Sequence, residues 1–174
     1  MKEALAALPA GEPVYAVLDG ARDRHVRQWA VHCGGAAWCL YRGELSPALQ
    51  SAAPYLLRLT GTLFDEFFER AWGKSWGVLL TSTASSRDLR RHLRKFLIAQ
   101  TEARERMLFR YYDPRVLRVY LPTCNGGELA EFFGPISAYL AEGEDASKWQ
   151  VFKPPEAARS RPAFRSIPRP EPTW

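Results

Sequence analysis

The chain has 174 residues, of which 47% are apolar and 25% charged, a balance typical of one soluble globular domain and not of a disordered or fibrous protein. Three cysteines without a Cys-x-x-Cys pair argue against a disulfide framework and against a zinc site. No apolar stretch reaches the length of a signal peptide core or a membrane-spanning helix. We therefore expect a cytoplasmic protein without a membrane partner.

Positive charge is concentrated near the carboxyl end. The net charge is +5, and residues 153–174 contain five basic side chains against two acidic ones. The rest of the chain therefore has a net charge of only +2. Because nucleic-acid-binding domains more often carry the excess on the folded surface, we expect no nucleic-acid partner.

Apolar runs alternate along the chain with segments whose apolar residues recur every three or four positions. The runs predict strands at 14–18, 37–41, 55–59, 75–81, 107–112 and 136–140. The periodic segments predict helices over 21–33, 44–52, 62–72, 85–97, 113–122 and 128–133. Thr62-x-x-Asp65 and Ser85-x-x-Asp88 resemble capping boxes at two of the helix starts.

Strands that are apolar on both faces are typical of a parallel sheet covered by helices. We therefore expect an α/β fold: a single three-layer domain over residues 12–142, with a mostly parallel or mixed sheet and helices on both faces. Residues 143–174 are rich in proline and arginine, which predicts a linker and an extended carboxyl-terminal tail.

The stretch from Met107 to Arg115 combines a predicted strand with a helix start. Asp113 can cap the helix, and Pro114 suits its first turn. The predicted strand therefore ends beside Arg110, Tyr112, Asp113 and Arg115, at the kind of sheet edge where α/β proteins bind ligands. Two interpretations remain open. Arg110 and Asp113 form a structural ion pair, or these residues form an exposed surface for a partner.

An enzymatic alternative uses Asp19 and Asp113, which both follow predicted strands. Two carboxylates at one sheet edge are suited to holding magnesium, which suggests a metal-dependent phosphoester hydrolase. The structural alternative is that Asp19 forms a turn and Asp113 caps a helix. The sequence contains no glycine-rich phosphate loop, no Gly-x-Ser-x-Gly motif and no histidine ligand pattern.

Further candidate surfaces are aromatic or basic. Trp76 follows a glycine-bounded turn, where a tryptophan serves either as a partner anchor or as part of the core. One face of the helix predicted at 85–97 carries Arg87, Arg91 and Arg94, which suits an acidic partner, with nucleic-acid binding as a third hypothesis. In the tail, Phe164 and Arg165 are candidate anchors that order on a partner.

Seven motifs occur in a fixed order along residues 14–140. They are Val14 to Ala21, Gly43-Glu44-Leu45, Ala53 to Leu56, Trp72 to Gly77, Leu89 to Phe96, Phe109 to Leu117 and Leu121-Pro122-Thr123. Together they resemble the domain of unknown function 4123, the adaptor and chaperone family of bacterial type VI secretion. Members of this family often continue into a sizeable carboxyl-terminal region, whereas about thirty residues follow the predicted domain here.

The resemblance implies a non-enzymatic, cytoplasmic protein without a cofactor. Its implied partners are a toxic effector and the spike protein (VgrG) of the secretion machine. The resemblance assigns no interface residue, so the expected partner-binding set rests on residue chemistry. This set comprises Trp76, Arg87, Arg91, Arg94, Arg110, Tyr112, Asp113, Arg115, Phe164 and Arg165.

Overall fold

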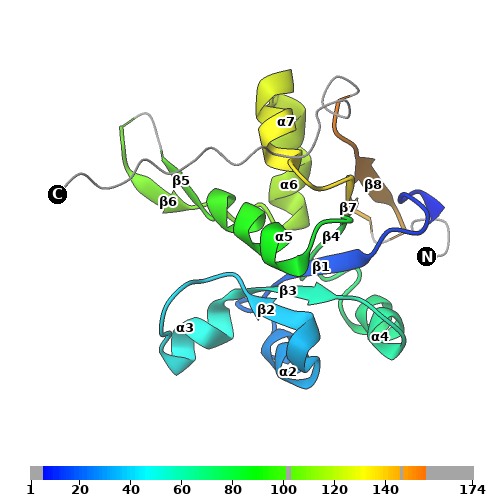
Figure 1. The fold of residues 1–174 in the computed structure, drawn as a ribbon, viewed down its shortest axis with the longest axis vertical. Helices are drawn as coiled ribbons and strands as arrows, with labels where there is room; N and C mark the ends of the chain where they lie inside the picture. The colour runs from blue at the N-terminus through cyan, green and yellow to red at the C-terminus, as the bar shows by residue number, and fades with distance from the viewer. Residues whose placement is uncertain (1–5, 101–102, 146, 156–174) are drawn as a thin grey trace.

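The computed structural model describes residues 6–100, 103–145 and 147–155, and its centre is a six-stranded sheet (Figure 1). The strands lie in the order β2-β3-β1-β4-β7-β8, and every neighbouring pair is antiparallel. Their bounds are Val14–Asp19 (β1), Ala37–Cys39 (β2), Pro54–Arg58 (β3), Gly77–Thr81 (β4), Ala138–Glu142 (β7) and Trp149–Phe152 (β8).

Helices cover both faces of this sheet. α2 and α4 lie on one face, and α5, α6 and α7 lie on the other (Figure 1). The α-helices span His25–His32 (α2), Pro47–Ala52 (α3), Thr62–Arg70 (α4), Ser86–Leu93 (α5), Pro114–Tyr120 (α6) and Gly126–Phe133 (α7), and the short 3-10 helices span Gly34–Ala36 (η1), Arg94–Phe96 (η2) and Leu121–Thr123 (η3). Alternate residues of β1 serve the two layers: Ala16 and Leu18 pack on the α2 side, and Tyr15 and Val17 on the α5 side.

The expectation of a parallel or mixed sheet is wrong. β1 and β2 point in the same direction on either side of α2, as a β-α-β unit predicts, but β3 lies between them and pairs antiparallel with both. The continuous apolar runs reflect a sheet that is covered on both faces. Such cover is compatible with either strand direction, so the apolar pattern did not determine the direction.

The helix starts illustrate how local signals act. The Ser85 hydroxyl accepts from the Asp88 amide at 3.1 Å and caps α5 as predicted. The predicted capping box at Thr62 does not form, because α4 begins at Thr62 itself and its cap is Gly61, with a φ of 53°. Glycine adopts this left-handed conformation at little cost, so no side-chain cap is needed for the chain to turn.

The strand expected at 107–112 is only partly present. Arg106–Leu108 (β6) pairs antiparallel with Ile98–Gln100 (β5) in a separate two-stranded hairpin (Figure 1). Tyr111 and Tyr112 then form a turn and are fully buried. Aromatic side chains are a more reliable sign of burial than of a strand, and here the two tyrosines fill the core from a turn. The predicted start of α6 is confirmed, because Asp113 caps the helix and Pro114 occupies its first position.

The sheet continues past residue 142, where the sequence predicts a linker. β8 pairs with β7 through Tyr139↔Phe152 to Glu142↔Trp149 and forms one edge of the sheet. Most of the predicted tail, including Phe164 and Arg165, lies outside the described residues. Within the described part of the chain, no helix is long and apolar enough to cross a membrane.

Candidate partner-binding face

Arg110 and Asp113, which the sequence brings together at one turn, have different partners in the structure. Arg110 donates from Nη2 to Oδ2 of Asp19, the residue that ends β1. The Asp19 carboxylate is buried, and its Oδ1 also accepts from the Ala21 amide at 3.0 Å. The interpretation in which Arg110 and Asp113 form an ion pair is therefore wrong, and Arg110 instead joins the turn before α6 to the end of β1.

Asp113 forms its own ion pair with the next arginine. It accepts from Arg115 three times: Oδ1 bonds the backbone amide at 3.0 Å and Nε at 2.9 Å, and Oδ2 bonds Nη2 at 2.6 Å. Burial alone would raise the pKa of the Asp113 carboxyl, but the Arg115 hydrogen bonds and the charges of Arg115 and Arg110 outweigh it and lower this pKa. Asp113 is thus a helix cap, and its partner Arg115 remains half exposed.

Two aromatic members of the expected set belong to the core. Trp76 is buried and packs against Trp29, with ring centroids 5.7 Å apart. Tyr112 is also buried, and burial together with the Asp19 charge raises its pKa. Neither ring is presented to a partner, so the core interpretation of Trp76 holds.

The hydrolase alternative finds no support in this geometry. Asp19 and Asp113 are each bound by a different arginine. Among the residues that the structure describes, no group of three or more His, Cys, Asp or Glu side chains is arranged to hold a metal ion. The two carboxylates therefore have structural roles that account for their positions.

The arginines of α5 and η2 form the exposed basic face that the sequence predicts. Leu89 and Leu93 point into the core, Arg87 and Arg91 are exposed, and Arg94 is partly buried at the end of β2. β2 is an edge strand, and the arginines bond the carbonyl group of its last residue and those of the two residues that follow. The bonds run from Arg90 Nε to Cys39 O at 3.2 Å, and from Arg94 to Cys39 O at 3.0 Å, Leu40 O at 2.8 Å and Tyr41 O at 2.7 Å.

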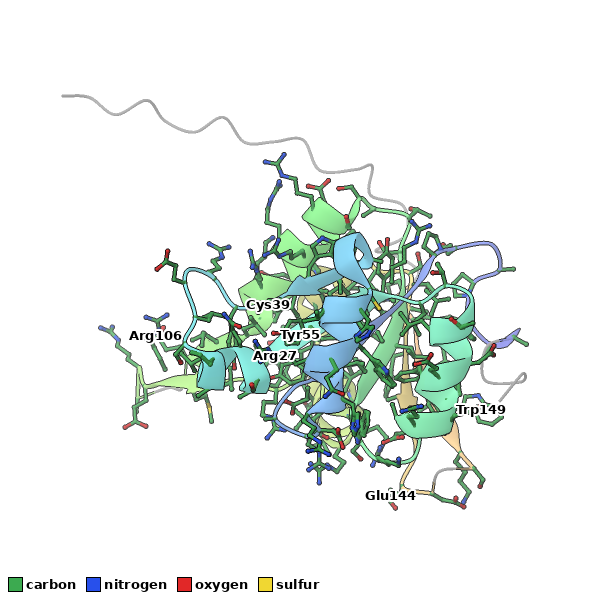
Figure 2. The ribbon with its side chains drawn as sticks, turned by 90° about the horizontal axis from the view of Figure 1, so that it is seen from below. Arg27, Cys39, Tyr55, Arg106, Glu144 and Trp149 are labelled. Atoms are coloured by element: carbon green, nitrogen blue, oxygen red, sulfur yellow. The ribbon has the colours of Figure 1, made fainter. Side chains whose placement is uncertain are left out.

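Two adjoining hollows lie along these arginines. The larger, about 660 Å³, runs from α5 toward α3 and includes Cys39 and Tyr55, which pair across β2 and β3 (Figure 2). The smaller, about 380 Å³, is lined by Trp38 of β2, by Arg42 and by residues of α5 and η2. Arg42, Arg90 and Arg94 line both. Within the combined surface, which Glu44 also lines, we call the arginines and the two neighbouring aromatic residues the arginine groove: Trp38, Tyr41, Arg42, Arg87, Arg90, Arg91 and Arg94.

Charge in the arginine groove is poorly compensated. Desolvation lowers the pKa of Arg94, and the neighbouring charges of Arg90 and Arg42 lower it further. Within the described residues, the ion pair that involves the groove is Arg91 with Asp88 at 3.2 Å, and both of these side chains are largely exposed. An exposed pair of this kind offsets little of the repulsion.

Tyr41 connects the arginine groove to the turn before α6. It lines the larger hollow and interacts with Tyr112, which neighbours Asp19. Of the expected set, the structure thus brings together Arg87, Arg91 and Arg94 on the groove. Arg42 and Trp38 were missed, because their contact with α5 depends on the position of β2 and leaves no local signal in the sequence.

The β5–β6 hairpin is a second exposed surface. Ile98 and Leu108 lie opposite each other across it and are 47% and 44% exposed, and Met107 is 54% exposed. Figure 2 shows Arg106 at its outer end. β5 follows η2 after a single residue, so the hairpin continues the chain directly from the arginine groove. A charged surface next to an apolar one has the composition of a protein-binding face.

Fold and surface thus define a small α/β protein whose exposed arginine groove and apolar hairpin are suited to binding another macromolecule. Its sequence matches the family model described as Domain of unknown function (DUF4123) over residues 14–131, and the chain belongs to this family. No curated protein and no solved structure matches it.

Proposed function

We propose that this protein is an adaptor, or chaperone, of type VI secretion. In this role it binds a toxic effector in the cytoplasm and helps to load it onto the spike protein VgrG, without catalysis and without a cofactor. Membership of the family supports the proposal through the resemblance described above. An adaptor needs exposed surfaces that recognise other proteins, and the arginine groove and the β5–β6 hairpin are exposed surfaces of suitable composition.

The observation that carries the proposal is the apolar β5–β6 hairpin beside the arginine groove. An isolated two-stranded hairpin is only marginally stable in water, and apolar residues on both of its faces gain from burial against a partner. Ile98 and Leu108 share one face because they lie opposite each other, whereas Met107 pairs with Ala99 one position along. The hairpin therefore has the properties expected of a docking element.

Co-expression of the tagged protein with the effector and the spike protein encoded near its gene tests the proposal. We expect both to co-purify, together or singly, over a range of salt concentrations. A variant with Met107→Ser and Leu108→Ser removes two exposed apolar side chains and should capture less of at least one partner.

Val119→Ser is the matched control, because Val119 is 71% exposed on α6 and lies outside the hairpin. All variants should keep the wild-type melting temperature, since the replaced side chains are solvent-exposed. If neither effector nor spike protein co-purifies with the wild type at any salt concentration, the adaptor proposal is wrong.

A further inference from the structure

We propose that the arginine groove binds an acidic segment of a partner protein in extended form, through the carboxylates of its side chains. This inference rests on the proposed adaptor function, since it names the chemistry by which a partner is recognised.

The groove is anchored at its base. Arg94 donates through Nε and Nη2 to three carbonyl oxygens, and Arg90 donates through Nε to Cys39. A guanidinium has five N–H donors, so these bonds orient both groups without exhausting them. A carboxylate that binds here meets donors whose geometry is already set, which lowers the entropy cost of binding.

The same bonds determine how a peptide can bind. β2 is an edge strand, and an edge strand normally offers its free backbone groups to an added strand. Here the outward Cys39 carbonyl is occupied by Arg90 and Arg94. Addition of a strand is blocked at this end of β2, so recognition falls to the side chains of the bound segment.

The arginines stand on two walls. Arg42 follows β2 on one side, and Arg87 and Arg91 project from α5 on the other. Burial and mutual repulsion already depress the Arg94 pKa at the base. Several carboxylates spaced along one peptide relieve this repulsion at both walls, and Trp38 offers an apolar surface between them.

The charge distribution favours an acidic peptide over a nucleic acid. The chain outside residues 153–174 has a net charge of only +2, so it lacks the large positive excess that is typical of nucleic-acid-binding domains. Glu44 lines the larger hollow, whereas none of the described residues that line the smaller one is acidic, so the unbroken positive charge is confined to the arginines of the smaller hollow. A short acidic segment suits a basic surface of this small extent.

Fluorescence anisotropy with the full chain tests the inference. The probes are a labelled peptide of Glu and Asp residues interrupted by Leu, the same peptide with Gln and Asn in place of the acids, and a single-stranded oligodeoxynucleotide. We expect the acidic peptide to bind at low salt, to weaken as salt increases, and to bind far more tightly than the neutral peptide.

Substitutions on each wall should weaken the acidic peptide. We expect a loss of several-fold for Arg42→Gln and of about tenfold or more for Arg87→Gln with Arg91→Gln. Arg24→Gln with Arg70→Gln is the matched control, because both arginines are exposed in the α2–α4 layer and their removal changes the net charge equally. This control should leave binding within twofold of wild type.

Three outcomes overturn the inference: equal binding of the acidic and neutral peptides, equal losses in the groove and control variants, or preferential binding of the oligodeoxynucleotide through the same arginines. Circular dichroism melts of every variant exclude unfolding as the cause. Capture of the effector or spike protein without acidic-peptide binding would refute this inference and leave the adaptor function intact. Acidic-peptide binding without capture of the effector or the spike protein would support this inference and refute the adaptor function.

Discussion

Replacement of Glu142 by glutamine should weaken the fold at one defined loop. Glu142 ends β7 and is only 4% exposed, and its two carboxylate oxygens accept from the backbone amides of Gly73 and Ser75. Both of these residues have positive φ, at 81° and 55°, so the loop between α4 and β4 depends on an anchor. No local sequence pattern marks Glu142 as an anchor.

The expected cost follows from the hydrogen bonds lost. Glutamine keeps one acceptor oxygen, but its NH₂ group faces the second amide, donor against donor. The loss of one charge-assisted hydrogen bond leaves a buried backbone amide without an acceptor. Together these changes lower the free energy of unfolding by about 2–4 kcal/mol. For a chain of this length, each kcal/mol lowers the melting temperature by about 2–4 °C.

Urea unfolding followed by tryptophan fluorescence measures this cost, because Trp76 adjoins the loop and is buried against Trp29. Glu144→Gln is the matched control, since Glu144 is exposed in the next turn of the chain (Figure 2). The control should unfold like wild type. A change below about 0.5 kcal/mol for Glu142→Gln, the range of ordinary surface substitutions, would refute the assigned anchoring role.

Three further predictions concern other buried polar groups. Burial lowers the pKa of His92, so the unfolded chain binds a proton at this residue more readily than the folded chain does. The stability due to His92 is therefore complete above about pH 6.5 and declines as the pH falls below that value. Urea midpoints should decline less in His92→Asn than in wild type over the same pH window. Asp113→Ala removes a helix cap but leaves Arg115 half exposed, so urea titration should give a loss of about 1–2 kcal/mol, and a loss above 3 kcal/mol would contradict this pairing. The buried Tyr139 hydroxyl has no hydrogen-bond partner among the described residues, so Tyr139→Phe should unfold at the same or a higher temperature in calorimetry, and a clear drop would reveal a partner.

Much of the local structure could be predicted from the sequence. The apolar runs that begin at Val14 and Ala37 coincide with β1 and β2, and the Ser85 and Asp113 signals mark the starts of α5 and α6. The arginines at α-helical spacing in α5 were assigned correctly to its outer face. These features depend on neighbours a few residues apart, so periodicity and capping chemistry specify them.

Tertiary structure alone decided the strand directions and the partners of the charged groups. Insertion of β3 between β1 and β2 depends on how whole strands compete for neighbours, which an apolar run does not encode. Arg110 bonds Asp19, 91 residues away, although Asp113 is three positions along. Arg42 likewise meets α5 only because β2 ends beside it. Such contacts join segments distant in sequence, and their geometry is set by the packed sheet and helices, so residue type and spacing do not reveal them.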